Sequence, residues 1–342
     1  MTDRELLAKI KQNSVGGAYL FAGEEDYLKR YYLLKLRESA IKDDTFATFN
    51  YLLLDGKDGD FGAIIDAIKS PPMFDDFKFI EWRYPPLSQM REEELARLEE
   101  ILLMLPEYDY AVLAMLADDE GVDLGTEKRP SKFRKRFADK LNILSFPKSK
   151  ESDLLSWLKR HFAEEGITVT RESLEALLFR SGRSMDVLNL ETQKLAYYLK
   201  ANGKDTLTVE DVKLVASSSP ESDTYALSNA VIERNRPAAI RALAELKRER
   251  VDPTIIIGML ARTYTELVTV TLMLRDGMSR ADIEEKSGIH KFKVGGYINA
   301  ARLFKPPSPV TILEELSRVD VSSKWGGVSG YTAIEMFISK CV

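Results

Sequence analysis

The residues best placed for chemistry are three carboxylates that follow a short apolar segment near the start of the chain. Residues 18–22 read as a strand, and Gly23-Glu24-Glu25-Asp26-Tyr27 leads from it into a helix. A phosphate-binding loop at such a connection needs several glycines, a lysine, and a Ser or Thr for magnesium. This connection has one glycine and three acids, which suit a helix N-terminus but repel a triphosphate. We therefore expect a nucleotide-binding architecture that has lost its nucleotide and has no cofactor.

No other group of residues has the composition of a catalytic or metal site. Asp118-Asp119-Glu120 follows an apolar segment and resembles a metal cluster, but a solvated acidic loop explains it better. The two histidines, His161 and His290, lie far apart, and neither belongs to a recognisable triad. With Cys341 as the single cysteine, zinc-ligand spacing is absent. The sequence predicts no catalytic site and no metal site.

Two segments could contact nucleic acid. Residues 279–304 have the spacing of a helix-turn-helix, with Lys291, Lys293 and Arg302 on the second helix. That helix is rich in Gly, Ala, Ile and Tyr and offers few side chains that can read bases, which favours two packed helices instead. A helix-turn-helix DNA-binding regulator remains the alternative function.

The second segment is a basic tract within residues 128–150. Its cations are Lys128, Arg129, Lys132, Arg134, Lys135, Arg136 and Lys140. They could contact phosphates without sequence preference, or they could form a solvated helix face. Because the net charge is −5, any contact with a polyanion has to come from such a local patch.

The elements around these residues divide the 342-residue chain into three parts. Residues 1–147 alternate between strands and helices, which predicts a parallel α/β sheet with helices on its faces. The strands are expected at 18–22, 50–54, 77–82, 110–116 and 141–146, and the helices at 24–41, 60–70, 92–105 and 131–140. Residues 148–216 read as a small helical domain, with helix starts at Thr170 and Thr208. Ser217-Ser218-Ser219-Pro220 reads as a linker that opens the third part, residues 217–342, in which residues 221–342 are again helical.

Composition and termini indicate a protein of the reducing cytoplasm. The first residues are polar and do not form a signal peptide. No apolar run approaches the roughly 20 residues that a membrane span needs. A single cysteine excludes an intrachain disulfide.

One stretch fits none of these patterns, namely Pro71-Pro72-Met73-Phe74-Asp75-Asp76 before the third strand. The prolines prevent a helix from continuing, so two large apolar side chains lie on a short extended connection. Taken alone, burial of Met73 and Phe74 under the following strand is the favoured interpretation. The other is a wedge that projects into another protein.

Segments in all three parts resemble one family. The matching stretches are residues 19–28, Pro72-Met73-Phe74, residues 181–186, Glu191, Lys194-Leu195-Ala196, Asp252-Pro253, residues 258–262, residues 288–290, Asp320 and residues 324–326. In order and spacing over nearly the full length, they resemble the delta subunit of the bacterial DNA polymerase III clamp loader. The resemblance implies an AAA+-like first domain without a working ATP site, a helical lid and a C-terminal helical collar for oligomerisation. The Ser-Arg-Cys motif of other clamp-loader subunits is missing, and the nearest stretch is Ser181-Gly182-Arg183.

The resemblance also implies a partner and a site. Delta subunits bind the ring-shaped sliding clamp, the beta subunit, through an apolar pair that matches Met73 and Phe74, flanked here by Pro72 and Asp75. Many relatives have Leu or another aliphatic residue where this chain has Met73, which keeps the volume and adapts to a pocket. Implied partners are the gamma/tau and delta-prime subunits, and DNA within the complex. On this interpretation the apolar pair is a clamp-opening wedge, and Arg129, Lys132, Arg134, Lys135 and Arg136 are possible DNA contacts.

Overall fold

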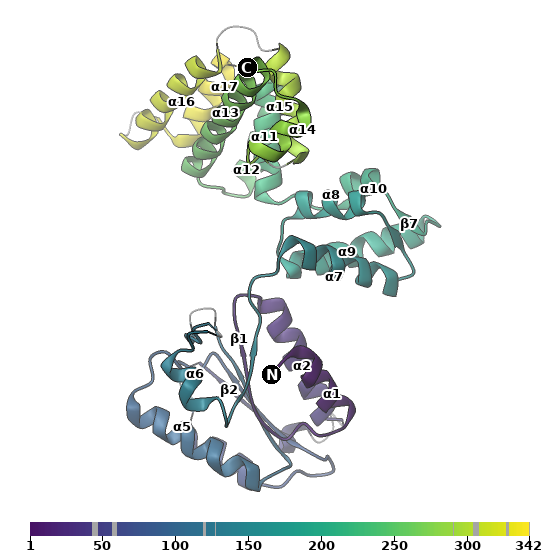
Figure 1. Ribbon diagram of the computed structural model, residues 1–342, viewed down its shortest axis with the longest axis vertical. Helices are drawn as coiled ribbons and strands as arrows, with labels where there is room; N and C mark the ends of the chain where they lie inside the picture. The colour runs from purple at the N-terminus through teal and green to yellow at the C-terminus, as the bar shows by residue number, and fades with distance from the viewer. Residues whose placement is uncertain are drawn as a thin grey trace. The chain divides into compact units, whose positions relative to one another are not determined.

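The chain forms two compact units, Met1–Leu154 and Leu155–Val342, and each is described by itself (Figure 1). The structure is a computed structural model that describes residues 1–42, 47–56, 60–118, 121–126, 128–289, 291–303, 308–325 and 328–341.

The first unit is built on a five-stranded parallel sheet. Its strands are β1 (Gly17–Ala22), β2 (Tyr51–Asp55), β3 (Lys78–Arg83), β4 (Ala111–Leu116) and β5 (Asn142–Ser145). They lie in the order β2-β3-β4-β1-β5, and every neighbouring pair is parallel. The sequence therefore predicted all five strands and their parallel arrangement, and the expected parallel α/β fold is confirmed.

Alternation along the strands separates two cores, one on each face of the sheet. Leu20 on β1 and Leu113 on β4 belong to one apolar cluster, while Phe21 and Val112, their neighbours in the chain, belong to the other. Successive side chains of a strand point to opposite faces, so strands buried on both sides read as continuous apolar runs. Figure 1 shows α1 and α2 on one side of the sheet and α5 and α6 on the other. The helices of this unit are α1 (Asp3–Lys11), α2 (Asp26–Ala40), α3 (Ala47–Asn50), α4 (Phe61–Lys69), α5 (Glu92–Met104) and α6 (Lys132–Phe137).

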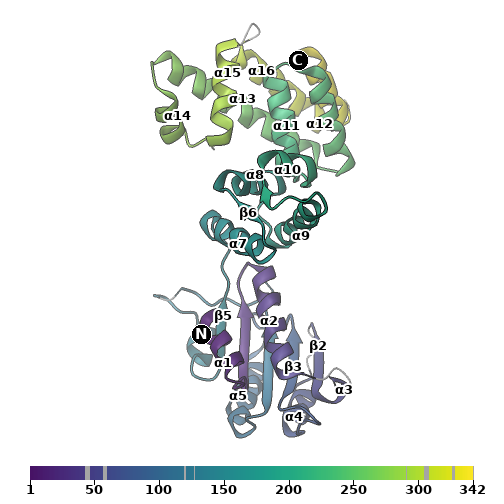
Figure 2. The same cartoon turned by 90° about the vertical axis from the view of Figure 1, so that its right-hand side faces the viewer.

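The second unit is mainly helical, as predicted. Its first part comprises α7 (Glu151–Glu164, which begins in the first unit), α8 (Arg171–Ser181), α9 (Met185–Ala201) and α10 (Val209–Val215). Figure 2 shows these helices around the short strand β6 (Thr168–Val169), which pairs in parallel with β7 (Thr206–Leu207). The sequence did not predict this pair, because strands of two residues are too short to show alternation of apolar and polar side chains. Thr170 and Thr208 cap α8 and α10 as predicted.

The remaining helices share an apolar core whose buried members all come from residues 227–341. They are α11 (Pro220–Ile232), α12 (Arg236–Arg248), α13 (Pro253–Arg275), α14 (Arg280–Lys286), α15 (Lys291–Leu303), α16 (Pro309–Lys324) and α17 (Gly330–Cys341). This separate core is compatible with the collar domain expected at residues 217–342, and the boundaries at 148 and 217 stay predictions.

Helix α13 is the one described helix with the length and apolar composition of a membrane span, a feature that the sequence analysis did not identify. Leu260, Tyr264 and Leu267 are buried in the core of residues 227–341. The Thr263 hydroxyl is hydrogen-bonded to Ser228 on α11 at 2.9 Å. Packing of this kind identifies α13 as the central helix of a bundle, a type of helix that passes the same composition test.

Candidate functional site

Residues 70–77, here called the tip loop, connect α4 to β3 at the amino edge of the parallel sheet. Nucleotides bind at the opposite, carboxyl edge of such sheets, so the tip loop lies away from the phosphate-loop position. Met73 is 45% exposed and Phe74 is 78% exposed. Burial, the interpretation favoured for this stretch when taken alone, is therefore wrong for both side chains. Phe77 and Phe79, which follow the exposed pair, belong to the core.

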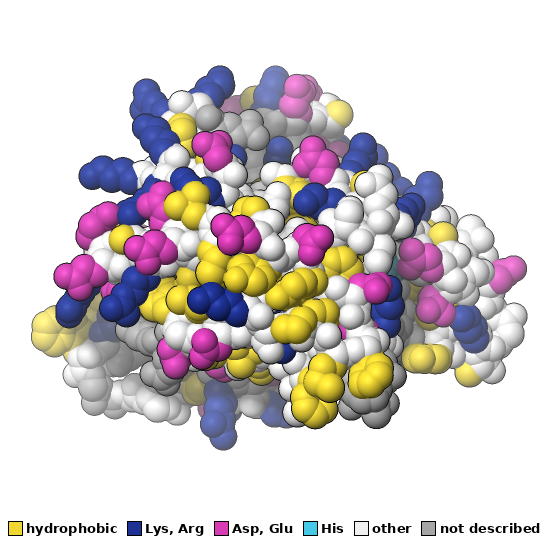
Figure 3. Space-filling view, turned by 90° about the horizontal axis from the view of Figure 1, so that it is seen from below, with side chains coloured by type: hydrophobic (Ala, Val, Ile, Leu, Met, Phe, Trp, Pro, Cys, Tyr) yellow, Lys and Arg dark blue, Asp and Glu magenta, His cyan; other side chains and the backbone are white. Residues whose placement is uncertain are grey.

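Exposure alone does not single out the tip loop. Leu53, Tyr84 and Leu103 of the same unit are exposed as well. Figure 3 shows a face of the molecule on which apolar side chains gather among Lys, Arg, Asp and Glu side chains. The tip loop differs from these scattered positions in having its backbone fixed by side chains from other segments.

Asn50, the last residue of α3, fixes the tip loop at Met73. Its side chain is fully buried. Its Oδ1 accepts a hydrogen bond from the Met73 N–H at 2.8 Å, and its Nδ2 donates to the Met73 carbonyl at 2.7 Å and to Asp75 Oδ2 at 3.0 Å. Both acceptors face the same nitrogen, which defines the orientation of the amide. One side chain thus satisfies both backbone polar groups of the residue before Phe74.

Phe74 has a left-handed backbone conformation, with φ of +62°. A bulky residue rarely adopts this region, because the Cβ approaches the following carbonyl oxygen at a cost of roughly 1–2 kcal/mol. Such a conformation persists where the surrounding structure determines it, and it is common at functional sites. The hydrogen bonds at Met73 and Asp75, on either side of Phe74, hold it in this conformation.

The two acids after Phe74 anchor the loop, whereas the sequence suggested only a flanking role for Asp75. Asp75 Oδ1 accepts from the Lys42 backbone N–H at 3.1 Å. Asp76 Oδ2 accepts from Lys42 Nζ at 2.6 Å and from Asn13 Nδ2 at 3.0 Å. The hydrogen bond from Lys42 and then that from Asn13 lower the pKa of Asp76 below its usual value. The ends of α1 and α2 therefore both hold the loop.

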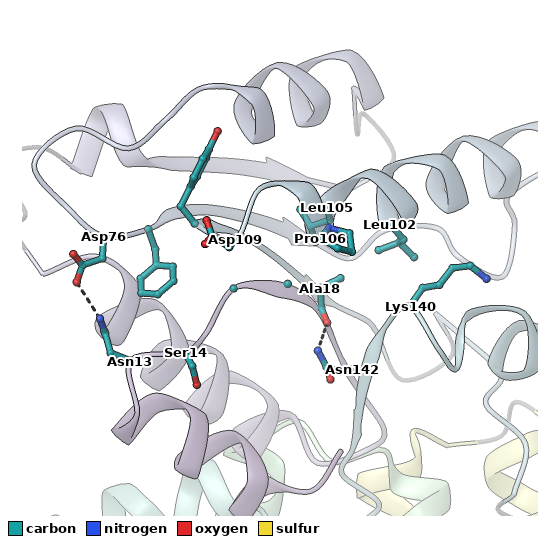
Figure 4. Close-up of a pocket in the computed structure, with 14 residues that line it drawn as sticks. Asn13, Ser14, Ala18, Asp76, Leu102, Leu105, Pro106, Asp109, Lys140 and Asn142 are labelled. Carbon is teal, nitrogen blue, oxygen red and sulfur yellow. Dashed lines mark hydrogen bonds between the residues drawn. The ribbon is translucent and has the colours of Figure 1, made fainter.

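A cavity of about 610 Å³ opens beside the tip loop at the amino ends of β1, β4 and β5. Figure 4 shows Asn13 bonded to Asp76 at one end, and Asn142 bonded to the Ala18 carbonyl deeper in. Leu102, Leu105 and Pro106 contribute apolar wall.

The connection after β1 is occupied by contacts within the protein. The Glu25 N–H donates to the Phe146 carbonyl at 3.0 Å, and Glu25 Oε2 accepts from the Ser149 N–H at 3.2 Å. Gly23 has φ of +107°, and a Cβ there would lie 2.4 Å from the Phe146 oxygen. Glycine at this position serves a close approach of two chain segments, which accounts for it without a phosphate.

Lys29, on the first turns of α2, is fully buried close to this connection. Its Nζ lies 2.8 Å from Asp26 Oδ1 and donates to the Ala117 carbonyl, just beyond β4, at 3.0 Å. A lysine in this neighbourhood is thus committed to internal partners. The phosphate-loop pattern did not point to Lys29, because the loop lysine was expected within residues 23–27.

In the part of the chain that the structure describes, the other chemical candidates do not assemble into a site. Among the described residues, no three His, Cys, Asp or Glu side chains lie close enough to hold a metal. The His161 ring packs on Trp157, and its Nδ1 lies 3.0 Å from the Trp157 carbonyl oxygen. His290, Asp119 and Glu120 lie outside the described residues.

The basic tract divides into two groups. Arg136 is paired with Glu92 and Glu99 of α5, at 2.6 and 2.8 Å, and Lys140 is 3.1 Å from Glu99. These pairs attach α6 to α5. Arg134 is half-buried, whereas Lys128, Arg129, Lys132 and Lys135 are exposed. The exposed group stays a prediction for phosphate contact, whereas Arg136 is engaged by α5.

The segment with helix-turn-helix spacing forms α14 and α15, but Lys293 faces the protein. Its Nζ lies 3.9 Å from Glu266 of α13 and over the ring of Tyr225, 5.5 Å from the centroid. Tyr297 donates to the same Glu266 at 2.8 Å. One of the two lysines assigned to base or phosphate contact therefore contributes to helix packing, and the side chain of Lys291 is not described.

Several of the residues behind the family resemblance hold the linker that follows α10. Glu191 is buried, and it accepts from the Ser217 N–H at 3.1 Å and pairs with Lys194 at 2.7 Å. Lys194 Nζ also lies 2.9 Å from Ser217 Oγ. From α8, Arg180 Nε donates to the Ala216 carbonyl and Ser181 Oγ to the Ser217 carbonyl. The linker predicted at 217–220 is thus held by side chains.

Comparison with known proteins gives consistent results over both units. The family model "DNA polymerase III, delta subunit" matches residues 19–123, and "DNA polymerase III delta subunit, C-terminal domain" matches residues 221–341. The chain is 21% identical to DNA polymerase III subunit delta of Bacillus subtilis over 334 residues, covering 96% of this chain and 94% of the relative. It is 25% identical to a probable DNA polymerase III subunit delta of Aquifex aeolicus over 317 residues, covering 90% and 85%.

The fold has a counterpart among solved structures. The Bacillus subtilis DNA clamp loader delta protein matches with a TM-score of 0.58 at 19% identity, covering 99% of both chains. Together with the two family models and the full-length relatives, this shared fold gives one assignment. The chain belongs to the family of DNA polymerase III delta subunits, the delta proteins of the clamp loader.

Proposed function

We propose that this chain binds the sliding clamp and opens its ring, as part of the complex that loads the clamp onto primed DNA in replication. The observation that carries the proposal is the exposed Phe74, held in a left-handed conformation on a loop with anchored ends. An exposed aromatic side chain fixed in this way has the properties of an interface anchor, because little conformational freedom remains to be lost on binding.

The proposed mechanism is a shift between conformations of the clamp. Phe74 and Met73 enter an apolar pocket of the clamp, where an anchor of this kind contributes at least about 2 kcal/mol. Pro72 and Asp75 flank the pair and set the direction of the chain. The ring opens if this contact is stronger in the open form than in the closed one, since a ligand shifts an equilibrium only through its differential affinity.

The proposed assembly supplies what this chain does not. We assign no catalytic site to the chain, because the connection after β1 and Lys29 are engaged with neighbouring residues. The ATP-dependent step belongs to partner subunits of the complex in the cytoplasm, where gamma/tau and delta-prime are the expected partners. Within the complex, the exposed Lys128, Arg129, Lys132 and Lys135 are the candidates for DNA phosphate contact, with Arg134 at their margin.

Clamp binding by the purified chain, without ATP, tests the proposal. The variant Met73→Ala/Phe74→Ala is expected to lose at least about 30-fold in affinity for the cognate clamp, the equivalent of one lost anchor. Leu190→Ala/Tyr197→Ala on α9 removes an equally exposed aliphatic and aromatic pair and serves as the control. Unchanged clamp affinity in the folded tip variant would remove the assignment. Micromolar ATP binding in a calorimetric titration of the same chain would contradict the non-catalytic role.

A regulator that reads duplex DNA through α15 is not favoured, because Lys293 is engaged by Glu266 and Tyr225. Sequence-selective binding of duplex DNA by the isolated chain, abolished by charge reversal at Lys291 and Lys293, would reinstate it.

A further inference from the structure

We infer that Asn50 is a positioning residue for clamp binding, which holds Phe74 in its binding conformation before the clamp arrives. The inference rests on the proposed function and assigns the tip a determinant outside the tip loop. The hydrogen bonds of Asn50 go to the residues beside Phe74. Asn50 acts through the backbone of Met73 and the carboxylate of Asp75.

The geometry requires an asparagine side chain. Both backbone polar groups of Met73 bond to one planar amide, at 2.7 and 2.8 Å, as they would to a neighbouring strand. The same Nδ2 also reaches Asp75, whose other oxygen accepts from the Lys42 N–H. Aspartate has the same shape, but it would place an acceptor against the Met73 carbonyl and the Asp75 carboxylate.

The position of Asn50 makes its hydrogen bonds strong determinants of the loop. The Asn50 side chain is fully buried, so water cannot replace a partner that its amide loses, and a loop that moved away would leave this amide unpaired. Phe74 sits in a conformation that its own backbone disfavours. Without Asn50, the loop is expected to relax to conformations with φ below zero at Phe74, which point the ring elsewhere.

A positioning role has a kinetic signature that separates it from a contact role. If only a fraction of molecules hold the tip correctly, apparent affinity falls by that fraction. The association rate falls with it, because fewer encounters are productive, while dissociation of the formed complex changes little. Phe74→Ala removes the contact itself and is expected to raise the dissociation rate.

Surface plasmon resonance on an immobilised cognate clamp tests this with the full chain. Asn50→Ala is expected to lower the association rate about tenfold and Asn50→Asp more, with dissociation nearly unchanged. Asn202→Ala removes an asparagine that bonds only to the Tyr198 carbonyl of its own helix end and serves as the control. Asn50→Ala added to Phe74→Ala is expected to cost little more than Phe74→Ala, since it positions a side chain no longer present.

The outcomes separate the two hypotheses. If Phe74→Ala weakens binding but a folded Asn50→Ala binds normally, the positioning role is wrong and the proposed function stands. If Phe74→Ala itself binds normally, the proposed function fails. Additive losses in the double variant would mean that Asn50 supports the fold in general. Should Asn50→Ala not fold, hydrogen exchange in the unaltered chain decides, because a Met73 amide held by Asn50 is protected and one exchanging at the rate of an open loop overturns the inference.

Discussion

Lys42 and Asp76 form an ion pair, with Lys42 Nζ 2.6 Å from Asp76 Oδ2, that joins the chain just after α2 to the tip loop. Both side chains are more than half exposed. Exposed pairs add little to stability by themselves. The Lys42–Asp76 pair instead holds the tip loop in place, since Asp76 is the second residue after Phe74.

The pH dependence of this contact follows from the lowered pKa of Asp76, whose cause is first the hydrogen bond from Lys42 and then that from Asn13. A lowered folded pKa stabilises the folded chain above the unfolded pKa of about 3.9, and this contribution disappears as the pH falls through the folded value. Asp76→Asn is therefore expected to be less stable than the unaltered chain at neutral pH and equally stable well below pH 4. Urea unfolding across this range measures it, and a difference independent of pH would contradict the assigned cause.

Phe74→Gly is expected to stabilise the free chain while weakening clamp binding. Glycine adopts a φ of +62° without a Cβ penalty, which offsets its own greater freedom in the unfolded chain and leaves a gain of about 0.5–1 kcal/mol. Phe74→Ala keeps the Cβ and is the control, with no such gain. Thermal unfolding of both variants provides the measurement. A Phe74→Gly variant less stable than Phe74→Ala would show that the conformation carries no strain, because only the greater freedom of glycine in the unfolded chain would then remain.

Lys194→Met tests the attachment of the linker after α10. The substitution leaves the buried Glu191 carboxylate with the Ser217 N–H but without its cation, at an expected cost of about 1–2 kcal/mol. The amides of Ser217 and Ser219 should then exchange hydrogen faster. Lys200→Met breaks the exposed pair with Glu165 and should change neither quantity measurably. Unaltered exchange at Ser217 in Lys194→Met would mean that Lys194 does not contribute to holding the linker.

Sequence patterns predicted the elements better than they predicted the tip. Short apolar runs that alternate with helical segments predicted the five strands, and capping residues such as Thr170 predicted helix starts. Both signals are local. Helix α1 was missed although Thr2 and Glu5 form a capping box, and α11 was missed after a Ser-rich stretch that reads as a linker. Both family models that match the chain describe the delta subunit that the sequence resembles, and the second unit is helical as expected.

The tip required contacts that no local pattern contains. The sequence predicts Asn50 as the first residue of a strand, whereas it ends α3 and bonds to residues more than 20 positions away. Nothing in the composition of residues 71–76 predicts a positive φ at Phe74, so burial was the natural expectation for two large apolar side chains. Arg136 resembled the other cations of its tract until its partners on α5 were known.

The register of β2 and β3 fixes where Asn50 lies relative to the tip loop, whatever the length of the chain between them. Asn50 directly precedes β2 and the tip loop directly precedes β3, and in this parallel pair Tyr51 lies opposite Phe79. Since the sheet aligns the starts of these two strands, insertions or deletions around α4 leave the relative placement of Asn50 and the tip loop unchanged. Descendants of this chain can therefore vary the length and sequence of that intervening segment while inheriting the same presentation of Phe74. The contact between Asn50 and the tip loop is therefore insensitive to sequence changes in α4, the helix that connects them.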